Sequence, residues 1–189
     1  KPLLINHLKL IINAIDEQEF EDIKKLRDKT IILVGFGGGF RRSELISIDY
    51  EDLEFVTEGL KITIRKSKTD QFGEGMIKGL PYFANENYCP VAHLKKWLEI
   101  SKINSGPIFR RFTKGSSLTN NRLTDQSVVL LMKKYLNLAG IANENFAGHS
   151  LRSGFATVAA ESGADERSIM EMTGHKTTQM VRRYIKEAN

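Results

Sequence analysis

The glycine-rich stretch GFGGGF, residues 35–40, places the strongest limit on how this chain can fold. It follows an apolar segment, residues 19–35, in which hydrophobic side chains recur at helical spacing. Consecutive glycines destabilise a helix and permit turns that other residues cannot adopt, so a helix must end here. The stretch lacks the GK[ST] of a phosphate-binding loop and the GxGxxG spacing of a dinucleotide-binding turn, and it follows a helix instead of a strand. We therefore predict a tight turn that presents the residues after it.

Helical periodicity accounts for most of the remaining chain. Pro90 is a favourable first-turn residue and Thr124 a favourable N-cap, so each predicts the start of a helix. The first two helices are expected to cover the core. Helices are predicted over approximately residues 4–15, 19–35, 41–48, 90–100, 125–138, 149–161, 165–173 and 177–187.

Three strand-like runs interrupt the helices, at residues 53–56, 60–65 and 76–82. The middle run, LKITIR, alternates apolar and polar side chains, as in a strand with one buried face. The basic, glycine-containing stretch RRFTKGSSLTNNR, residues 110–122, is predicted to be a surface loop. We therefore expect the α+β class, with one mostly helical domain and a small three-stranded antiparallel sheet.

Composition narrows the class of partner and the compartment. The formal net charge is +5 and the pI is near 9.3, which suits a polyanionic partner such as nucleic acid. Cys89 is the one cysteine, which excludes an intrachain disulfide and a multi-cysteine zinc site and fits a reducing cytoplasm. No apolar run approaches the ~20 residues needed to cross a bilayer, so we expect a cytoplasmic protein without a membrane partner.

Two short motifs place chemically capable side chains at helical spacing. Arg41 and Glu44, in FRRSEL, are three residues apart and can approach each other on one helix, although a surface ion pair has the same spacing. His149 and Arg152, in GHSLR, are also helical neighbours, although a capping histidine followed by a surface arginine would look the same. Each motif alone therefore fits a structural role as well as a functional one.

A second Gly-His pair comes near the end of the chain. His175 follows Gly174, and Tyr184 lies nine residues after His175. This histidine also fits a helix-capping turn, and the tyrosine fits a core position, because Met180 and Tyr184 have i, i+4 spacing.

In combination and order, these motifs resemble the tyrosine recombinase family, also called the phage integrase family. The resemblance runs from about Phe20 to Lys186 and implies that residues 1–189 form the catalytic domain, with the family's N-terminal core-DNA-binding domain absent from this chain. It implies a site-specific DNA recombinase or integrase that cleaves and rejoins strands through a 3′-phosphotyrosyl intermediate. It implies no cofactor and no metal, and the sequence has no HExxH, CxxC or paired acidic cluster spaced to hold metals.

The resemblance assigns catalytic roles to Arg41, Lys68, His149, Arg152, His175 and Tyr184, with Glu44 in support. The two guanidiniums would meet the non-bridging phosphate oxygens with paired donors. A tyrosine oxygen is a poor nucleophile while protonated, so His149 would accept the proton of Tyr184. Lys68 would protonate the departing 5′-oxygen, His175 would hydrogen-bond the phosphate, and Glu44 would orient an arginine or a histidine.

Two assignments and two alternative functions stay open at this point. Arg42 adjoins Arg41, so the assignment of Arg41 rests on its RxxE spacing to Glu44 alone. Lys66 shares a strand face with Lys68, so direction does not separate them, and Lys68 is preferred because it lies nearer the turn, in the KT context that the family's hairpin lysine often has. A type IB topoisomerase has a similar catalytic architecture but typically has lysine in place of the HxxR histidine, which favours the recombinase here. A DNA-binding module with inert catalytic residues is the other alternative.

Double-stranded DNA is the partner that the resemblance implies. We expect phosphate contacts from a set of basic residues outside the catalytic group: Arg42, Lys66, Arg110, Arg111, Lys114 and Arg122. Exchange between two duplexes needs four active sites, so the resemblance implies a homotetramer on DNA for the full-length protein and a monomer for this chain.

Overall fold

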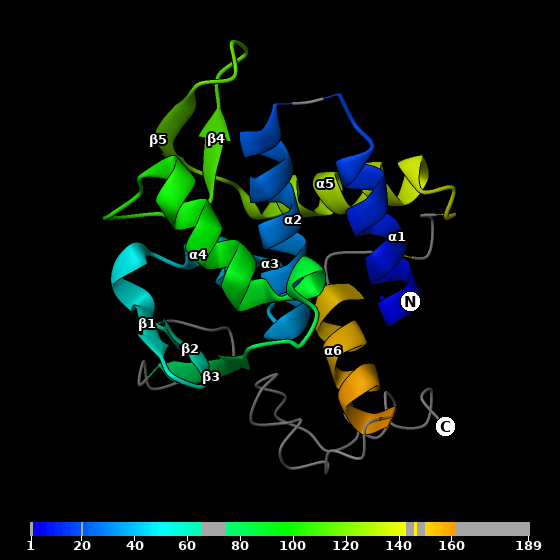
Figure 1. The fold of residues 1–189 in the computed structure, drawn as a ribbon, viewed down its shortest axis with the longest axis horizontal. Helices are drawn as coiled ribbons and strands as arrows, with labels where there is room; N and C mark the ends of the chain where they lie inside the picture. Colours follow the sequence, from blue (N-terminus) through cyan, green and yellow to red (C-terminus); the bar gives the residue numbers. More distant parts are fainter. Residues whose placement is uncertain (1, 20, 66–74, 143–145, 147–149, 162–189) are drawn as a thin grey trace.

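A computed structural model describes residues 2–19, 21–65, 75–142, 146 and 150–161 (Figure 1). The helices in this part are α1 (Ile5–Asp16), α2 (Asp22–Gly37), α3 (Arg42–Ser47), α4 (Pro90–Ser101), α5 (Asp125–Leu138) and α6 (Ser150–Glu161), with 3-10 helices η1 (Tyr50–Asp52) and η2 (Glu86–Tyr88). The strands are β1 (Leu53–Val56), β2 (Gly59–Ile64), β3 (Met76–Pro81), β4 (Arg110–Phe112) and β5 (Leu118–Arg122). The expected class, mostly helical with a three-stranded antiparallel sheet, is confirmed. The helices predicted over 165–173 and 177–187 lie outside the described residues.

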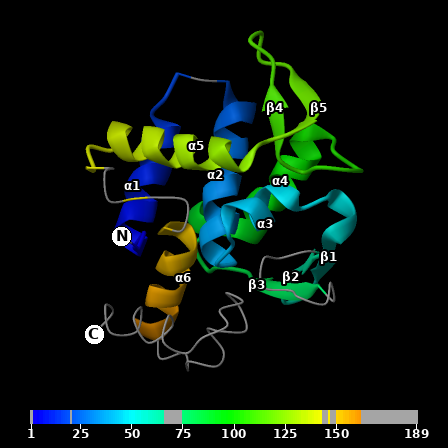
Figure 2. The same cartoon turned by 180° about the vertical axis from the view of Figure 1, so that it is seen from behind.

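Helix α2 lies at the centre, where it contacts α1, α3, α4, α5 and α6 (Figures 1 and 2). Its second half, TIILVGF at residues 30–36, is buried on every side because it presents no charged face. The sequence predicts a core-covering helix, and the structure places the second half of this helix inside the core. A helix that is apolar on every side is kept from water only when other elements pack all around it, and here five helices do so.

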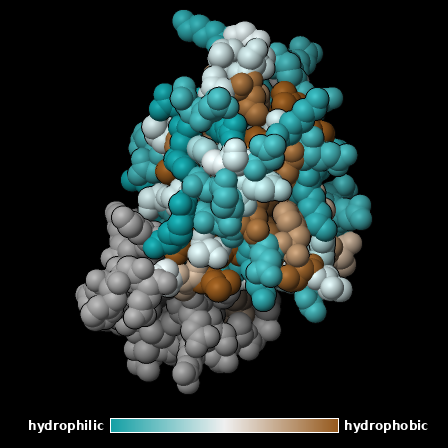
Figure 3. All heavy atoms as spheres, turned by 90° about the vertical axis from the view of Figure 1, so that its left-hand side faces the viewer, coloured by the Kyte–Doolittle hydropathy of each residue, from teal (hydrophilic) through white to brown (hydrophobic). Residues whose placement is uncertain are grey.

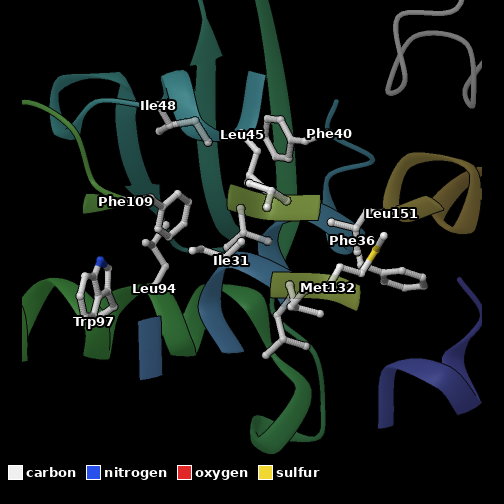
Figure 4. Close-up of a cluster of buried hydrophobic side chains, with 14 of the residues drawn as sticks. Ile31, Phe36, Phe40, Leu45, Ile48, Leu94, Trp97, Phe109, Met132 and Leu151 are labelled. Atoms are coloured by element: carbon white, nitrogen blue, oxygen red, sulfur yellow. The ribbon is translucent and has the colours of Figure 1, made fainter. Parts of the chain in front are cut away.

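Side chains from the helices around α2 meet its apolar half in one core. Ile31 of α2, Trp97 of α4, Met132 of α5 and Leu151 of α6 belong to this cluster (Figure 4). The buried indole keeps its hydrogen bond, because Trp97 Nε1 donates to the carbonyl oxygen of Ile108 at 2.8 Å. Hydrophilic side chains predominate on the face that Figure 3 presents, with smaller apolar areas between them. None of the described helices is both long and apolar enough to cross a bilayer.

The three-stranded sheet has the order β1-β2-β3, with antiparallel pairing throughout. The predicted strands are confirmed to within one residue at each end. Alternation along β2 turns Leu60, Ile62 and Ile64 toward the core. In β3 the same alternation leaves Ile77 67% exposed and Lys78 0% exposed. This strand therefore buries a charged side chain and exposes an apolar one, the reverse of the usual pattern.

Residues 110–122 form a hairpin, where a loop is predicted from the sequence. Strands β4 and β5 pair in a separate two-stranded antiparallel sheet, with Phe112 opposite Leu118. The prediction of a loop is wrong because the polar composition hides this apolar pair. Phe112 also packs edge-on against Trp97, with ring centroids 6.5 Å apart, and this contact fixes the hairpin on α4.

Two local predictions about helix starts are confirmed. Helix α4 begins at Pro90, where the missing N–H of proline costs no intrahelical bond. Helix α5 begins after Thr124, whose side chain accepts a hydrogen bond from the backbone N–H of Ser127 at 3.3 Å.

Candidate active site

The glycine turn that ends α2 is built by three features of residues 35–40. Gly39 has φ +60°, a left-handed conformation that glycine adopts without the steric cost of a side chain. The N–H of Gly39 donates to the carbonyl of Phe36 at 3.2 Å, and the N–H of Phe40 donates to that of Gly35 at 3.0 Å. These two bonds satisfy carbonyl groups that the end of a helix leaves without partners. The predicted turn is thus confirmed, and Arg41 is the first residue after it.

Arg41 is the N-cap of α3, and Glu44 lies in the first turn of that helix. The Glu44 carboxylate accepts a hydrogen bond from the backbone N–H of Arg41, with Oε1 3.0 Å from the nitrogen. Glu44 is only 4% exposed, so the interpretation as a surface ion pair does not hold, and the contact between the two residues runs through the backbone of Arg41. A buried carboxylate at this point fixes where the arginine backbone begins its helix.

Helix α6 lies against the end of α2 and carries Arg152, which is 3% exposed. Glycines in α2 and in the turn after it make this close approach possible. A Cβ at Gly35 would lie 2.8 Å from a methyl carbon of Leu151, and a Cβ at Gly39 would lie 2.7 Å from the ring of Phe155. Arg152 lies between these two contacts in sequence, so α6 is docked on both sides of it.

The chain before α1 also holds α6 in place. The N–H of Leu3 donates to the carbonyl of Ser150 at 3.1 Å, and a Cβ at Gly154 would lie 2.1 Å from the carbonyl oxygen of Leu3. Backbone and helix therefore meet at a position where only glycine fits. Leu3 itself is fully buried.

We expect Gly154→Ala to lower the free energy of unfolding by roughly 1–3 kcal/mol, because the added methyl must displace backbone. The higher helix propensity of alanine, worth about 1 kcal/mol, acts in the opposite direction, but a Cβ only 2.1 Å from a backbone oxygen places the steric cost toward the upper end of this range. Urea unfolding measures the change. Gly79→Ala in β3 is the control, since a Cβ there has no neighbour within 4 Å. Equal stability of the two variants would contradict this account of the contact.

Lys78 is absent from the residues predicted from the sequence, yet the fold brings it to the glycine turn. Its Nζ donates to the carbonyl oxygens of Gly38 and Gly39, at 3.0 and 3.1 Å, and lies 4.6 Å from the ring centroid of Phe40. One signal in the sequence could have found it. Period-two alternation puts Lys78 on the same face of β3 as Met76 and Leu80, where a charged side chain is unexpected.

Three charged groups of the candidate site act on Lys78. Burial lowers the pKa of Lys78 to about 8, the carboxylate of Glu44 raises it, and the guanidiniums of Arg152 and Arg41 lower it further. These four side chains come from α3, α6, β3 and the turn that ends α2. The structure thus brings together the two arginines and the glutamate that the motifs identify.

Arg42 takes a different direction from Arg41. Its guanidinium lies 3.5 Å from the carboxylate of Asp125 in α5. Helix α3 also contacts α5 at this side. Arg42 is therefore engaged with a neighbouring helix, whereas Arg41 lies in the cluster around Lys78.

Five of the predicted catalytic or DNA-contacting residues lie outside the described residues: Lys66, Lys68, His149, His175 and Tyr184. The strand ends that flank residues 66–74 are described, and Ile64 pairs with Met76 there. The fold thus fixes both ends of the segment that contains Lys66 and Lys68.

An ionic network anchors the start of that segment. Arg65, its N-terminal neighbour, lies 2.6 Å from the carboxylate of Asp49 and 3.1 Å from that of Asp52. Arg122 binds the other oxygen of Asp49 at 2.5 Å and the carbonyl of Ile46 at 2.8 Å. Burial raises the pKa of Asp49, but the hydrogen bonds from Arg122 and Arg65 outweigh it, and the net shift is downward.

The remaining predicted DNA contacts lie on the β4–β5 hairpin. The guanidinium of Arg110 donates hydrogen bonds to the carbonyls of Pro107 and Ser105. It also donates to the side chain of Asn120 at 3.0 Å, and this bond links the two strands of the hairpin. Arg111 and Lys114 are exposed. Exposed cations are available to an anionic partner, whereas Arg110 and Arg122 already serve contacts inside the chain.

Comparison with known proteins identifies similar sequences. The model of the phage integrase family matches residues 3–189. The integrase/recombinase xerD homolog of Selenomonas ruminantium is 48% identical over 188 residues, which make up 100% of this chain and 54% of that protein. The tyrosine recombinase XerA of Pyrococcus horikoshii is 28% identical over 186 residues, or 98% of this chain and 56% of that protein. The chain thus spans about half the length of the curated relatives it matches.

Comparison with solved structures identifies the same fold. The XerH site-specific recombinase bound to palindromic difH substrate, a post-cleavage complex, superposes with a TM-score of 0.79 at 20% identity, covering 100% of this chain and 50% of that one. A lambda integrase dimer bound to a COC′ core site has a TM-score of 0.67 at 16% identity, covering 98% of this chain and 47% of that one. At these identities the likeness concerns the fold.

Proposed function

Because the chain belongs to the phage integrase family of tyrosine recombinases, we propose that residues 1–189 are the catalytic domain of a site-specific DNA recombinase. The observation that carries the proposal is the cluster at the end of α2. There the glycine turn presents Arg41, α6 presents Arg152, and the buried carboxylate of Glu44 fixes the first turn of α3. Two guanidiniums held at one place suit a phosphodiester whose oxygens gain charge during displacement.

The reaction we propose exchanges one phosphate ester for another. The phenol oxygen of Tyr184 attacks the scissile phosphorus while His149 accepts its proton, and the bond from phosphorus to the 5′-oxygen breaks. Lys68 gives a proton to that oxygen as it departs. The products are a 3′-phosphotyrosyl enzyme and a free 5′-hydroxyl, and the hydroxyl of a second strand reverses the step. His175 donates a hydrogen bond to the phosphate oxygens.

Double-stranded DNA is the partner that we propose. Among the predicted DNA contacts in the described part of the chain, two are exposed, Arg111 and Lys114 of the β4–β5 hairpin. Their exposure supports a role in phosphate binding. Four active sites are needed to exchange strands between two duplexes, so we propose a homotetramer on DNA for the whole protein. The cytoplasm is the proposed compartment.

A covalent-capture experiment tests this function. The protein is incubated with a pool of random-sequence duplexes that carry a nick, in monovalent salt with excess EDTA, and the mixture is separated on a denaturing gel. We expect a protein–DNA adduct and new 5′-hydroxyl ends that polynucleotide kinase can label without prior phosphatase treatment. EDTA leaves the yield unchanged because no step requires a metal ion.

Three other results would contradict the proposal in different ways. Loss of the adduct in EDTA with recovery in magnesium would indicate another mechanistic class. DNA binding without any adduct would indicate an inert DNA-binding module. Relaxation of supercoiled plasmid by the monomer, without strand exchange, would favour a type IB topoisomerase.

A further inference from the structure

We propose that Lys78 is a positioning residue for strand cleavage: its ammonium group holds the glycine turn in the conformation that presents Arg41 to the scissile phosphate. The inference rests on the proposed function, since it concerns the same site. Lys78 is 0% exposed, so its Nζ cannot itself touch DNA and must act through the groups that it binds. Those groups are the carbonyl oxygens of Gly38 and Gly39, at 3.0 and 3.1 Å.

The position of these carbonyls explains why a cation is needed. Gly38 is the C-cap of α2, so its carbonyl lies at the end of the helix that carries partial negative charge. A phosphate held by Arg41 would lie beside this end and would be repelled by it. The ammonium of Lys78 binds two of the carbonyl oxygens and offsets their charge, as a basic side chain in the last turn of a helix does. Here the basic side chain comes from β3, 39 residues from Gly39 in sequence.

The surroundings of Lys78 make its charge sensitive to pH. The charged groups that act on it are Glu44 from α3, Arg152 from α6, and Arg41, while Phe40 contributes a ring face 4.6 Å away. Burial is the largest influence and lowers the pKa of Lys78 to about 8. Above that pH a neutral amine can still donate hydrogen bonds to the carbonyls, but it no longer offsets their charge.

The variant Lys78→Met separates this role from simple packing, because methionine fills a similar volume without charge or donors. We expect single-turnover cleavage of a nicked duplex to slow about 10- to 100-fold near pH 7, with DNA binding little changed. The ratio of the wild-type rate to the variant rate should fall as the pH rises through about 8. A packing role alone would give a ratio that does not change with pH.

Lys61→Met is the matched control. Lys61 is an exposed lysine of the same sheet and lies directly opposite Gly79. We expect the Lys61→Met variant to cleave DNA at the wild-type rate across the pH range. A second control uses DNA with sulfur at the 5′-bridging position, since a thiolate leaves without a proton. Sulfur should not rescue Lys78→Met, and rescue would overturn the proposal by making Lys78 the proton donor.

A measurement without DNA tests the electrostatic part independently. The pKa of Lys78 is about 8 in the folded protein and 10.5 when unperturbed, so between these values the unfolded chain binds a proton that the folded chain has lost. The free energy of unfolding of the wild type, relative to Lys78→Met, should therefore rise as the pH increases from about 8 to 10.5. A difference that stays constant with pH would overturn the assigned charge state.

These outcomes distinguish a failure of the inference from a failure of the function. If the wild type cleaves DNA and Lys78→Met cleaves equally fast with the same pH dependence, the positioning role is wrong and the recombinase function stands. If the wild type forms no adduct under any condition, the proposed function is wrong, and the role of Lys78 falls with it.

Discussion

Replacing Tyr184 with phenylalanine is expected to abolish the covalent protein–DNA adduct while DNA binding is retained. The substitution removes one oxygen atom, the proposed nucleophile, and leaves the ring and all of the cations in place. Covalent capture on a denaturing gel measures the adduct, and a gel-shift assay measures binding. A persistent adduct in Tyr184→Phe would show that another side chain attacks the phosphorus.

The structure supplies a matched control for this experiment. Tyr135 is fully buried in α5, and its hydroxyl donates to the carboxylate of Asp28 at 2.5 Å. Burial and, next, the charge of Asp28 raise the pKa of Tyr135 far above that of an exposed tyrosine, so this phenol is held protonated and away from DNA. Tyr135→Phe should therefore form the adduct, although with a less stable fold. Tyr82→Phe, at a half-exposed position on the molecule's surface, should form it as well.

Replacing Arg152 with lysine is expected to slow cleavage about 10²- to 10³-fold, although the positive charge is kept. Lysine offers a point charge, whereas the guanidinium offers a planar set of donors that can meet two phosphate oxygens at once. Helix α6 is docked through Leu151 on Gly35 of α2 and through Phe155 on Gly39 of the turn, so the lysine has little freedom to find another geometry. Single-turnover cleavage measures the loss, and binding should change much less.

Arg27→Lys is the control for the loss of a largely buried guanidinium. Arg27 lies in the first half of α2, where it pairs with Asp28 at 2.9 Å and donates to the carbonyl of Arg110. This variant should lose some stability and keep its cleavage rate. If Arg27→Lys and Arg152→Lys lost cleavage equally, the effect would be one of folding, and the phosphate role of Arg152 would be unsupported.

Local sequence patterns determined most of the secondary structure. Helical periodicity, Pro90 and Thr124 predicted the starts of α4 and α5, and alternation predicted β1 to β3 to within a residue. The glycine run predicted the end of α2 and the turn before Arg41. These features depend on neighbours a few positions away, so the sequence contains the information directly.

The candidate site shows how far such local information extends. The order and spacing of the motifs singled out Arg41, Glu44 and Arg152, and the structure places these three around one helix end. The RxxE spacing to Glu44 was the only ground in the sequence for preferring Arg41 to its neighbour Arg42. Packing gives the two arginines different neighbours: Arg42 lies 3.5 Å from Asp125 of α5, while the charge of Arg41 acts on Lys78.

Contacts between distant segments decided everything else. The apolar run at residues 30–36 indicates that this part of α2 is buried, but which helices bury it is decided by tertiary packing alone. The β4–β5 hairpin depends on Phe112 meeting Leu118 and Trp97. Lys78 gains its partners from a turn about 40 residues away, and its burial follows from the face of β3 that the sheet turns inward. Sequence periodicity fixes which side chains share a face, whereas only tertiary packing decides what each face meets.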